Sequence, residues 1–270
     1  MTGSGNERVV IKLGGSLITE KSKLCTPRRE VIKEIALAIN ELRSNGISMI
    51  LVHGAGSFGH LKAKSWSLDK GTNESISGGF GLTSQIDAVN SVRADMEHLN
   101  SIIVDELSNL DIPTMVHPPR DWVTGIGHNF TGDLSRFASY DFVHITFGDV
   151  VDCNDERLFG ILSGDDLIYR IGTEMENVSR IIFAMGDVDG LMTEPPESEN
   201  SKLIQTWSSK DGINGLHDEN VDVTGGIFLK ASRAAKAAEC GLDVLFIRGT
   251  KNRIISASMG KDCISTRIIS

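Results

Sequence analysis

The sequence predicts an α/β fold with a largely parallel central sheet. Two observations favour this class: short apolar runs rich in β-branched residues alternate with helical patterns, and glycines cluster where those runs end. The chain has 270 residues, 40% hydrophobic and 23% charged, so it can bury a sizeable core. No repeat or long linker divides it. We therefore expect a single domain over 1–270, with an N-terminal lobe of about 1–172 and a C-terminal lobe of about 173–270.

The first half of the chain alternates strands with helices. Its predicted strands are 8–13, 47–52, 112–116 and 142–147, and 157–162 is expected to return as a hairpin. After the first strand we expect a helix with Thr26 as N-cap and Pro27 at its first position, ending before Gly46. A long helix over about 83–110 has apolar residues three and four positions apart. The polar, glycine-rich segment 67–81 is expected to be a flexible connection or a lid.

The second half repeats this scheme. Its predicted strands are 180–185, 242–247 and 264–269. An alanine-rich helix that carries Lys230 is expected to open at 222–226. The acidic segment 194–200 contains two adjacent prolines and is expected to be an exposed loop.

Glycines near predicted strand ends are the most informative feature of the sequence. They are Gly14, Gly15, Gly54, Gly56, Gly148, Gly164, Gly190, Gly225 and Gly226. In open α/β sheets, ligands bind beyond the carboxyl ends of strands, where glycine lets backbone N–H groups approach an anion. Any single loop is equally compatible with a tight turn, but several such loops with lysines nearby favour phosphate binding. The sequence has no GxxxxGK[ST] motif, and residues 54–59 make a poor dinucleotide fingerprint.

Three lysines are candidate phosphate ligands. Lys12 lies within the first strand beside Gly14, where an unpaired ammonium is costly to bury, so we expect it to face an anion or a carboxylate. Lys21 follows just past the end of that strand, and Lys230 lies about one turn into its helix. Lys21 and Lys230 are also compatible with ordinary solvated positions.

Histidines and aspartates at predicted strand ends extend the candidate site. His60 ends the second glycine loop, where an imidazole can donate to a phosphate oxygen, although a lone histidine is more often structural. His53 is expected to be a packing residue. The aspartates are Asp149, Asp165, Asp166, Asp187 and Asp189. Each is a candidate to hold a lysine, a ribose or Mg²⁺, or to lie in an ordinary surface turn.

Charge and composition argue against several other classes of function. A net charge of −9 does not suit a protein whose main partner is nucleic acid. The four cysteines are far apart and form neither a zinc motif nor a disulfide framework, which favours reduced thiols in the cytoplasm. No apolar run approaches the ~18 residues of a membrane span, so we expect no membrane partner.

These motifs together resemble the amino acid kinase superfamily and, more closely, its isopentenyl phosphate kinase branch. The segments that carry the resemblance are IKLGGSLITEK (11–21), VHGAGSFGH (52–60), RADMEHLNSIIVDEL (93–107), FGDV (147–150), SGDD (163–166), DVDG (187–190) and DVTGG with the following Lys230 (222–230). They span nearly the whole chain in the family's order. DVDG is shared across the superfamily. The GSFGH loop, combined with the RADMEHLN helix, is far more specific than DVDG to kinases of isopentenyl phosphate and the related fosfomycin kinases.

The resemblance implies an αβα sandwich, a homodimer, and an ATP- and Mg²⁺-dependent kinase of isoprenoid formation. Such an enzyme converts isopentenyl phosphate into isopentenyl diphosphate by direct in-line transfer, with the acceptor in the N-terminal lobe and ATP in the C-terminal lobe. Phosphoryl transfer requires mainly positioning and charge neutralisation. A monophosphate with a second pKa near ~6 is already largely dianionic at neutral pH, so no strong general base is expected.

The family's site residues map onto this sequence by motif. Those implied for the transferring phosphates and the nucleotide are Lys12, Gly14, Gly15, Ser16, Gly56, Asp187, Gly226 and Lys230. Those implied for the acceptor are Gly54, Ala55, Gly59, His60 and Gly148. Lys12, Lys21 and His60 are the implied catalytic residues: Lys21 stabilises the transition state and His60 positions the acceptor phosphate. No residue is assigned as a metal ligand.

Two positions depart from the family pattern. Ala55 stands where glycine is common and would turn a methyl group towards phosphate. Gly186 stands where threonine is common and removes a hydroxyl near the nucleotide.

Two other functions remain open. A fosfomycin-type kinase, or a kinase of a carboxylate or carbamate, would keep the fold and change the acceptor, although no arginine stands in the 54–60 loop to clamp a carboxylate. The choice depends on the pocket behind His60, where Ile86, Val89, Val92 and Met96 either line a space for an isoprenoid tail or form plain core. A non-catalytic nucleotide- or anion-binding protein is the second alternative. The presence of both Lys21 and His60 argues against it.

Overall fold

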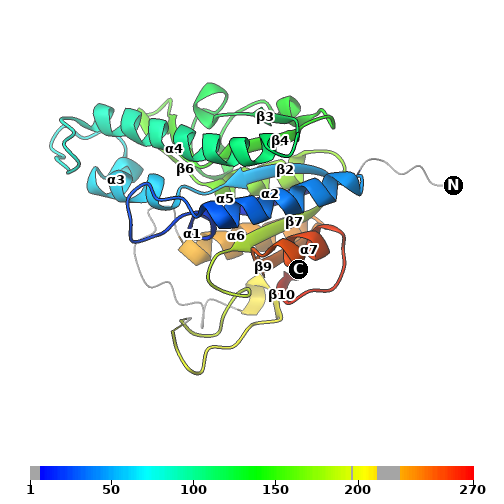
Figure 1. The fold of residues 1–270 in the computed structure, drawn as a ribbon. Coiled ribbons are helices and arrows are strands. Elements are labelled where there is room, and N and C mark those ends of the chain that lie inside the picture. Colours follow the sequence, from blue (N-terminus) through cyan, green and yellow to red (C-terminus); the bar gives the residue numbers. More distant parts are fainter. Residues whose placement is uncertain (1–6, 196, 212–225) are drawn as a thin grey trace.

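A computed structural model describes residues 7–195, 197–211 and 226–270. Within these residues, one eight-stranded sheet carries helices on both faces, which confirms the α/β class and the αβα sandwich (Figure 1). In order across the sheet, the strands are β3 (Thr114–Val116), β4 (Val143–Phe147), β2 (Ser48–His53), β1 (Arg8–Leu13), β7 (Val178–Met185), β9 (Asp243–Arg248), β10 (Ser265–Ile268) and β8 (Thr206–Trp207).

The direction of the strands brings their connecting loops together. From β3 across to β9 the strands are parallel, whereas β10 runs antiparallel to β9 and β8 pairs parallel with β10. The predicted hairpin also forms, because β6 (Phe159–Leu162) pairs antiparallel with β5 (Asp149–Asp152) outside the main sheet. Since β4, β2, β1 and β7 are neighbours with one direction, the loops at their carboxyl ends meet at one edge.

The helices cover the two faces of the sheet unequally. One face carries α2 (Arg29–Ser44), α4 (Gln85–Ser108) and α7 (Lys251–Ser258), and the other carries α5 (Gly164–Glu174) and α6 (Gly226–Glu239), as Figure 1 shows. In β1, Val9, Ile11 and Leu13 pack beneath the first group of helices and Val10 beneath the second. Because side chains alternate along a strand, Lys12 faces the α5 side.

The structure corrects the expected start of α2. This helix begins two residues later than expected, with Arg28 as its N-cap residue, and both Thr26 and Pro27 lie outside it. Pro27 instead bridges to Thr19, and the Arg28 N–H donates to the Ile18 carbonyl at 2.8 Å. Contacts with the preceding loop therefore override the local Thr-Pro start signal.

The helices that were not predicted include α5 and α7. α5 follows β6 directly, and its N-cap residue Ser163 accepts from the Asp165 N–H at 3.1 Å. The Ser-x-x-Asp pattern at 163–166 is the start signal that would have identified it. α7 is only eight residues long, too short for its apolar spacing to stand out.

The glycine-rich segment 67–81 is tied to the helices on either side of it. Trp66 is buried, and its indole N–H donates to the Gly79 carbonyl at 3.1 Å. Gln85, the first residue of α4, accepts from the Asn73 N–H at 2.7 Å and donates to the Trp66 carbonyl at 2.9 Å. The segment is therefore held by hydrogen bonds to Trp66 and to Gln85 at the start of α4.

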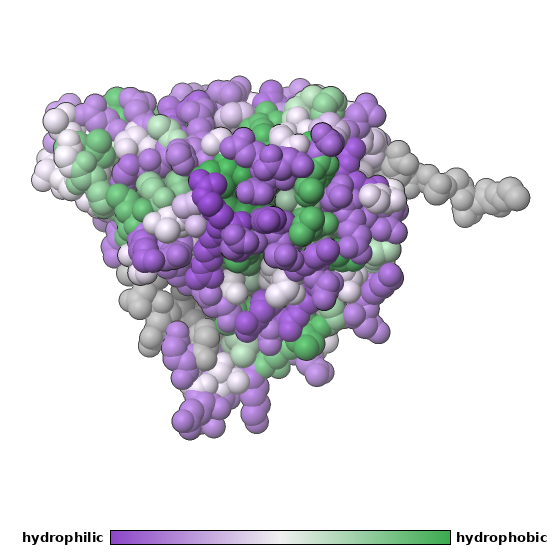
Figure 2. All heavy atoms as spheres, in the orientation of Figure 1, coloured by the Kyte–Doolittle hydropathy of each residue, from purple (hydrophilic) through white to green (hydrophobic). Residues whose placement is uncertain are grey.

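Polar residues cover most of the face viewed in Figure 2, with hydrophobic residues in separate patches among them. The exposed large hydrophobic residues are Leu24, Leu61, Phe80, Ile86, Leu158, Ile264 and Ile269. Among the residues that the structure describes, no helix combines the length and apolarity needed to cross a bilayer.

Candidate active site at the edge of the sheet

The loops that follow β1 and β2 interlock. A side-chain carbon added at Gly15 would lie 2.4 Å from the Gly56 nitrogen, and one added at Gly54 would lie 2.9 Å from the Gly15 nitrogen. Gly56 also has a φ of +50°, a left-handed conformation that glycine adopts without strain. Only glycine fits at these three positions. The two loops therefore expose main-chain atoms and not side chains, and main-chain N–H groups are what form an anion-binding nest.

Thr19 fastens the two loops together. It follows the short helix α1 (Gly15–Ile18) and is fully buried. Its hydroxyl donates to the Gly15 carbonyl at 2.8 Å and accepts from the Ser57 N–H at 2.9 Å. Thr19 was not predicted as a site residue, because its partner Ser57 is remote in the chain and nothing in the local pattern marks a threonine for such a role.

Lys12 faces a carboxylate, as predicted. Its side chain is 6% exposed, and the ammonium pairs with Oδ1 of Asp165, in the first turn of α5. Lys230 of α6 lies 3.5 Å from Oδ2 of the same carboxylate. The Asp165 side chain is 1% exposed, so one buried carboxylate holds two ammonium groups at the base of the glycine loops. The carboxylate therefore keeps two ammonium groups close together, and lysine ammonium groups are common ligands of phosphate.

A second cluster of charges lies at the surface, where β7 ends. The ammonium of Lys21 lies 3.9 Å from Oδ2 of Asp187, and the guanidinium of Arg28 lies 3.4 Å from Oδ1. The side chains of Lys21 and Asp187 are 74% and 49% exposed. Exposed ion pairs contribute little to stability, so Lys21 can exchange this partner for a phosphate at small cost. Arg28 was not predicted as a site residue.

The glycine loop of residues 54–60 is backed by α4. His60 is half-buried and begins α3 (His60–Ser65). A side-chain carbon at Gly59 would lie 2.7 Å from the Ala55 methyl, 3.5 Å from the sulfur of Met96 and 3.8 Å from a methyl of Val92. The apolar residues of α4 thus lie directly behind the loop.

A model of the amino acid kinase family matches residues 7–248 of the chain. The chain belongs to this family. Isopentenyl phosphate kinase from Methanothermobacter thermautotrophicus is 31% identical over 274 residues, covering 96% of this chain and 98% of that protein. A solved isopentenyl phosphate kinase structure superposes with a TM-score of 0.80 at 28% identity, covering 97% of this chain and 100% of the other. Carbamate kinase from Giardia lamblia, with a TM-score of 0.68 at 12% identity, shares the fold alone.

The structure gives physical reasons for both departures from the amino acid kinase pattern. The Ala55 methyl lies against Gly59 and packs on the hydrophobic cluster that includes Met96, so it is accommodated beside the core. A side-chain carbon at Gly186 would lie 2.6 Å from the Ser16 carbonyl oxygen. Glycine at 186 therefore allows the end of β7 to approach α1 closely, where a threonine would collide with it.

The remaining predicted site residues lie at the same edge or outside the described chain. The Gly14 N–H donates to the Ala184 carbonyl of β7 at 2.9 Å, and the Gly148 N–H donates to the His53 carbonyl at 3.0 Å. Gly226 begins α6, and its carbonyl accepts from the Lys230 ammonium at 3.1 Å. Residues 222–225 of the DVTGG motif lie outside the described residues.

The other three predicted aspartates have surroundings that differ from those of Asp165 and Asp187. Asp149 is buried, and burial raises its pKa to about 7. Asp166 pairs with Arg233 at 2.6 Å, and Asp189 pairs with arginines of β9 and α7 at 2.9 and 2.6 Å. Among the described residues, no three His, Cys, Asp or Glu side chains are grouped closely enough to hold a metal ion.

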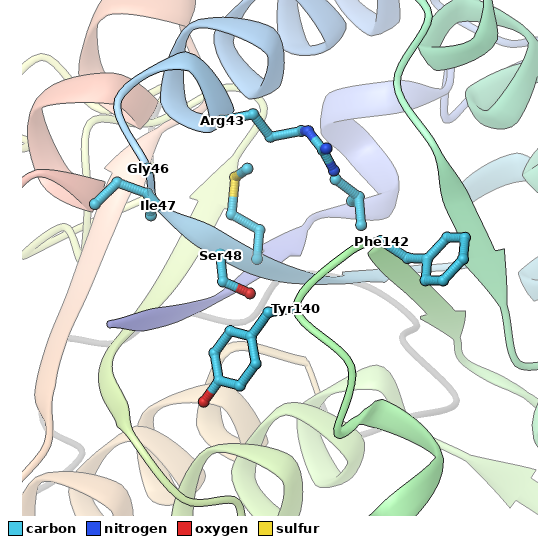
Figure 3. A pocket seen from close by; sticks show the side chains of 8 residues that line it. Arg43, Gly46, Ile47, Ser48, Tyr140 and Phe142 are labelled. Atoms are coloured by element: carbon cyan, nitrogen blue, oxygen red, sulfur yellow. The ribbon is translucent and has the colours of Figure 1, made fainter. Parts of the chain in front are cut away.

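Two surface hollows lie at different places around the sheet. A groove of about 660 Å³ runs beside Lys21 and Arg28, along the loop that leads into α2. A smaller hollow of about 150 Å³ is lined by the starts of β2 and β4 together with Arg43 and Tyr140 (Figure 3). In parallel sheets, ligands bind at the carboxyl ends of strands. The groove therefore belongs to the candidate site, and the hollow of Figure 3 does not.

Proposed function

We propose that this protein is an ATP-dependent kinase that phosphorylates isopentenyl phosphate to isopentenyl diphosphate. The observation that carries the proposal is the pairing of Lys12 and Lys230 on buried Asp165 beside two interlocked glycine loops. This arrangement suits an acceptor and a donor that both carry phosphate. The isopentenyl phosphate kinases that the chain resembles over nearly its full length supply the identity of the acceptor.

The proposed reaction depends on charge neutralisation. Lys12 and Lys230 reduce the repulsion between the donor and acceptor phosphates, and the main-chain N–H groups of the Gly15 and Gly56 loops bind phosphate oxygens. Lys21, whose exposed side chain makes a surface pair with Asp187, moves onto the transferring phosphoryl group. The acceptor phosphate is already dianionic and attacks directly, so His60 positions it by hydrogen bonding and does not act as a base.

Mg²⁺ would enter this site bound to ATP and supply further neutralisation of the β- and γ-phosphates. Asp165 and Asp187 are the carboxylates that pair with the lysines proposed to bind phosphate. We further propose that the acceptor occupies the lobe before about residue 172 and ATP the lobe after it, and that the protein acts in the cytoplasm as a homodimer.

The first experiment measures ADP release with Mg-ATP and a panel of acceptors: isopentenyl phosphate, fosfomycin, carbamate and several amino acids. Fast turnover on isopentenyl phosphate alone is expected. Turnover confined to another acceptor would retain the kinase chemistry and overturn the assigned substrate. Binding of ATP with no turnover on any acceptor would instead favour the non-catalytic alternative.

Replacing His60 with Ala is expected to raise KM for isopentenyl phosphate by about tenfold or more, because a hydrogen bond to a charged group is lost. Affinity for ATP, measured by calorimetry, is expected to stay within about threefold. The variants His60→Asn and His60→Gln place an amide donor near Nδ1 and Nε2 respectively, so the one that restores KM identifies the donating nitrogen. Loss of ATP binding in His60→Ala would contradict the proposal that His60 binds the acceptor, because it would place His60 in the nucleotide site.

Replacing Met96 with Ala is expected to shift the chain-length preference towards longer prenyl phosphates. Met96 is fully buried behind Gly59, so its truncation opens enclosed space next to the acceptor loop. Ile86 is 58% exposed, so Ile86→Ala opens no enclosed space and serves as the matched control. Relative kcat/KM for prenyl phosphates of increasing length is the measurement. If the chain-length preference shifted in Ile86→Ala but not in Met96→Ala, the prenyl tail would instead lie against the start of α4.

A further inference from the structure

His53 lies where the two acceptor-side loops leave the sheet. It is the last residue of β2, fully buried, and pairs in register with Leu13 of β1 and Phe147 of β4. Its main-chain carbonyl accepts from the Gly148 N–H at 3.0 Å. The backbone of His53 therefore holds one loop, and its side chain turns towards the other.

The imidazole has a defined orientation. Its Nδ1 lies 3.2 Å from the carbonyl oxygen of Gly54, and its ring stacks on Phe147 with 4.8 Å between centroids. Because a carbonyl oxygen can only accept a hydrogen bond, Nδ1 carries the proton and Nε2 is the unprotonated nitrogen. The Asn100 side chain of α4 faces the ring as well.

We propose that His53 is a positioning residue of the acceptor site, and that its Nδ1–H fixes the Gly54 peptide and ties the 54–60 loop to Gly148. The inference rests on the kinase function proposed above and adds a residue to it. The sequence predicted only a packing role for His53.

The hydrogen bond has a consequence beyond Gly54. A peptide unit is planar and trans, so holding the Gly54 carbonyl towards the ring turns the Ala55 N–H in the opposite direction. Gly54 also lies against the Gly15 nitrogen, so rotation of this peptide would disturb the loop after β1. One buried imidazole thus sets the direction of the Ala55 N–H, which we propose as a hydrogen-bond donor to phosphate. It also maintains the contact between the loops that follow β1 and β2.

The imidazole remains neutral while it does so. Burial is the largest influence on its pKa and lowers it to about 4, and the smaller influences come from Gly54 and Asn100, neither of which is charged. The proton on Nδ1 is therefore retained across the working pH range, and the ring is a constant donor and not a titrating base.

The test compares His53→Asn with His53→Gln. Asparagine places an amide donor near Nδ1 and keeps the bond to Gly54, whereas glutamine fills more of the ring's volume but places its donor near Nε2. We expect KM for isopentenyl phosphate to rise about tenfold in His53→Gln and less than about threefold in His53→Asn, with KM for ATP little changed in either. If His53 only packs, the larger glutamine restores function better than asparagine, and that order would overturn the proposal.

A measurement on the unmodified protein keeps the proposal testable if either variant fails to fold. ¹⁵N NMR of histidine-labelled protein is expected to show His53 as a neutral Nδ1–H tautomer that does not titrate between pH 5.5 and 8. An Nε2–H tautomer, or titration in that range, would contradict it. The tautomer does not depend on the acceptor. If the acceptor panel identifies another substrate, the proposed function fails while this inference is still tested, with KM measured for that substrate.

Discussion

Replacing Lys21 with Ala is expected to lower kcat by about 10²-fold or more, while KM for either substrate changes by less than about threefold. The Lys21 side chain is 74% exposed and its ammonium lies 3.9 Å from Asp187, so the pair contributes little to the folded state and the ammonium is available to a phosphoryl group in transit. An interaction made mainly in the transition state lowers kcat without changing substrate affinity. Single-turnover measurement of product formation checks this expectation.

Lys23 provides the matched control for Lys21. It lies in the same loop, its side chain is 65% exposed, and it pairs with Glu20 at 2.6 Å rather than with Asp187. Lys23→Ala is expected to keep kcat within about twofold of the unmodified protein, because it removes a similar surface charge without a role at the site. Near-normal turnover in Lys21→Ala, or an equal loss in both variants, would remove Lys21 from the mechanism.

Most of the sheet was predictable because its longer strands have strong local signals, whereas the two-residue strand β8 was not predicted. β1 begins and ends at the predicted residues, and the buried strands near it appear in the sequence as continuous apolar runs bounded by glycine. The start of α2 was not predictable in the same way. Thr26 and Pro27 form a valid local start signal, but hydrogen bonds and a bridge to residues 18–19 decide their conformation.

A site residue was predictable from the sequence where its charge does not suit the apolar residues around it. Lys12 is a charged residue in an apolar strand, and that conflict predicted that it faces an anion or a carboxylate; in the structure it pairs with the carboxylate of Asp165. Thr19 and Arg28 create no such conflict. A threonine before a loop and an arginine near a helix start are ordinary, and only the fold brings them to Ser57 and Asp187.

Replacing Asp165 with Asn is expected to affect both stability and activity. Lys12 is 6% exposed, so the substitution removes the carboxylate of a buried ion pair and is expected to destabilise the fold by about 3 kcal/mol, measured by urea unfolding. Lys230 loses the same partner, so the two ammonium groups are no longer held together beside the glycine loops. We expect kcat/KM to fall by about 10²-fold or more at a temperature where the variant is still folded.

Asp166 separates these two effects. It is the neighbouring residue in the first turn of α5 and is also buried, but it pairs with Arg233 at 2.6 Å. Asp166→Asn therefore breaks a comparable buried pair and is expected to cost a similar free energy of unfolding. It leaves the pairing of Lys12 and Lys230 in place, so kcat/KM is expected to stay within about fivefold of the unmodified protein. If both variants lost activity in proportion to their loss of stability, Asp165 would be a structural residue. A selective loss in Asp165→Asn requires that the lysine pair itself serves the reaction.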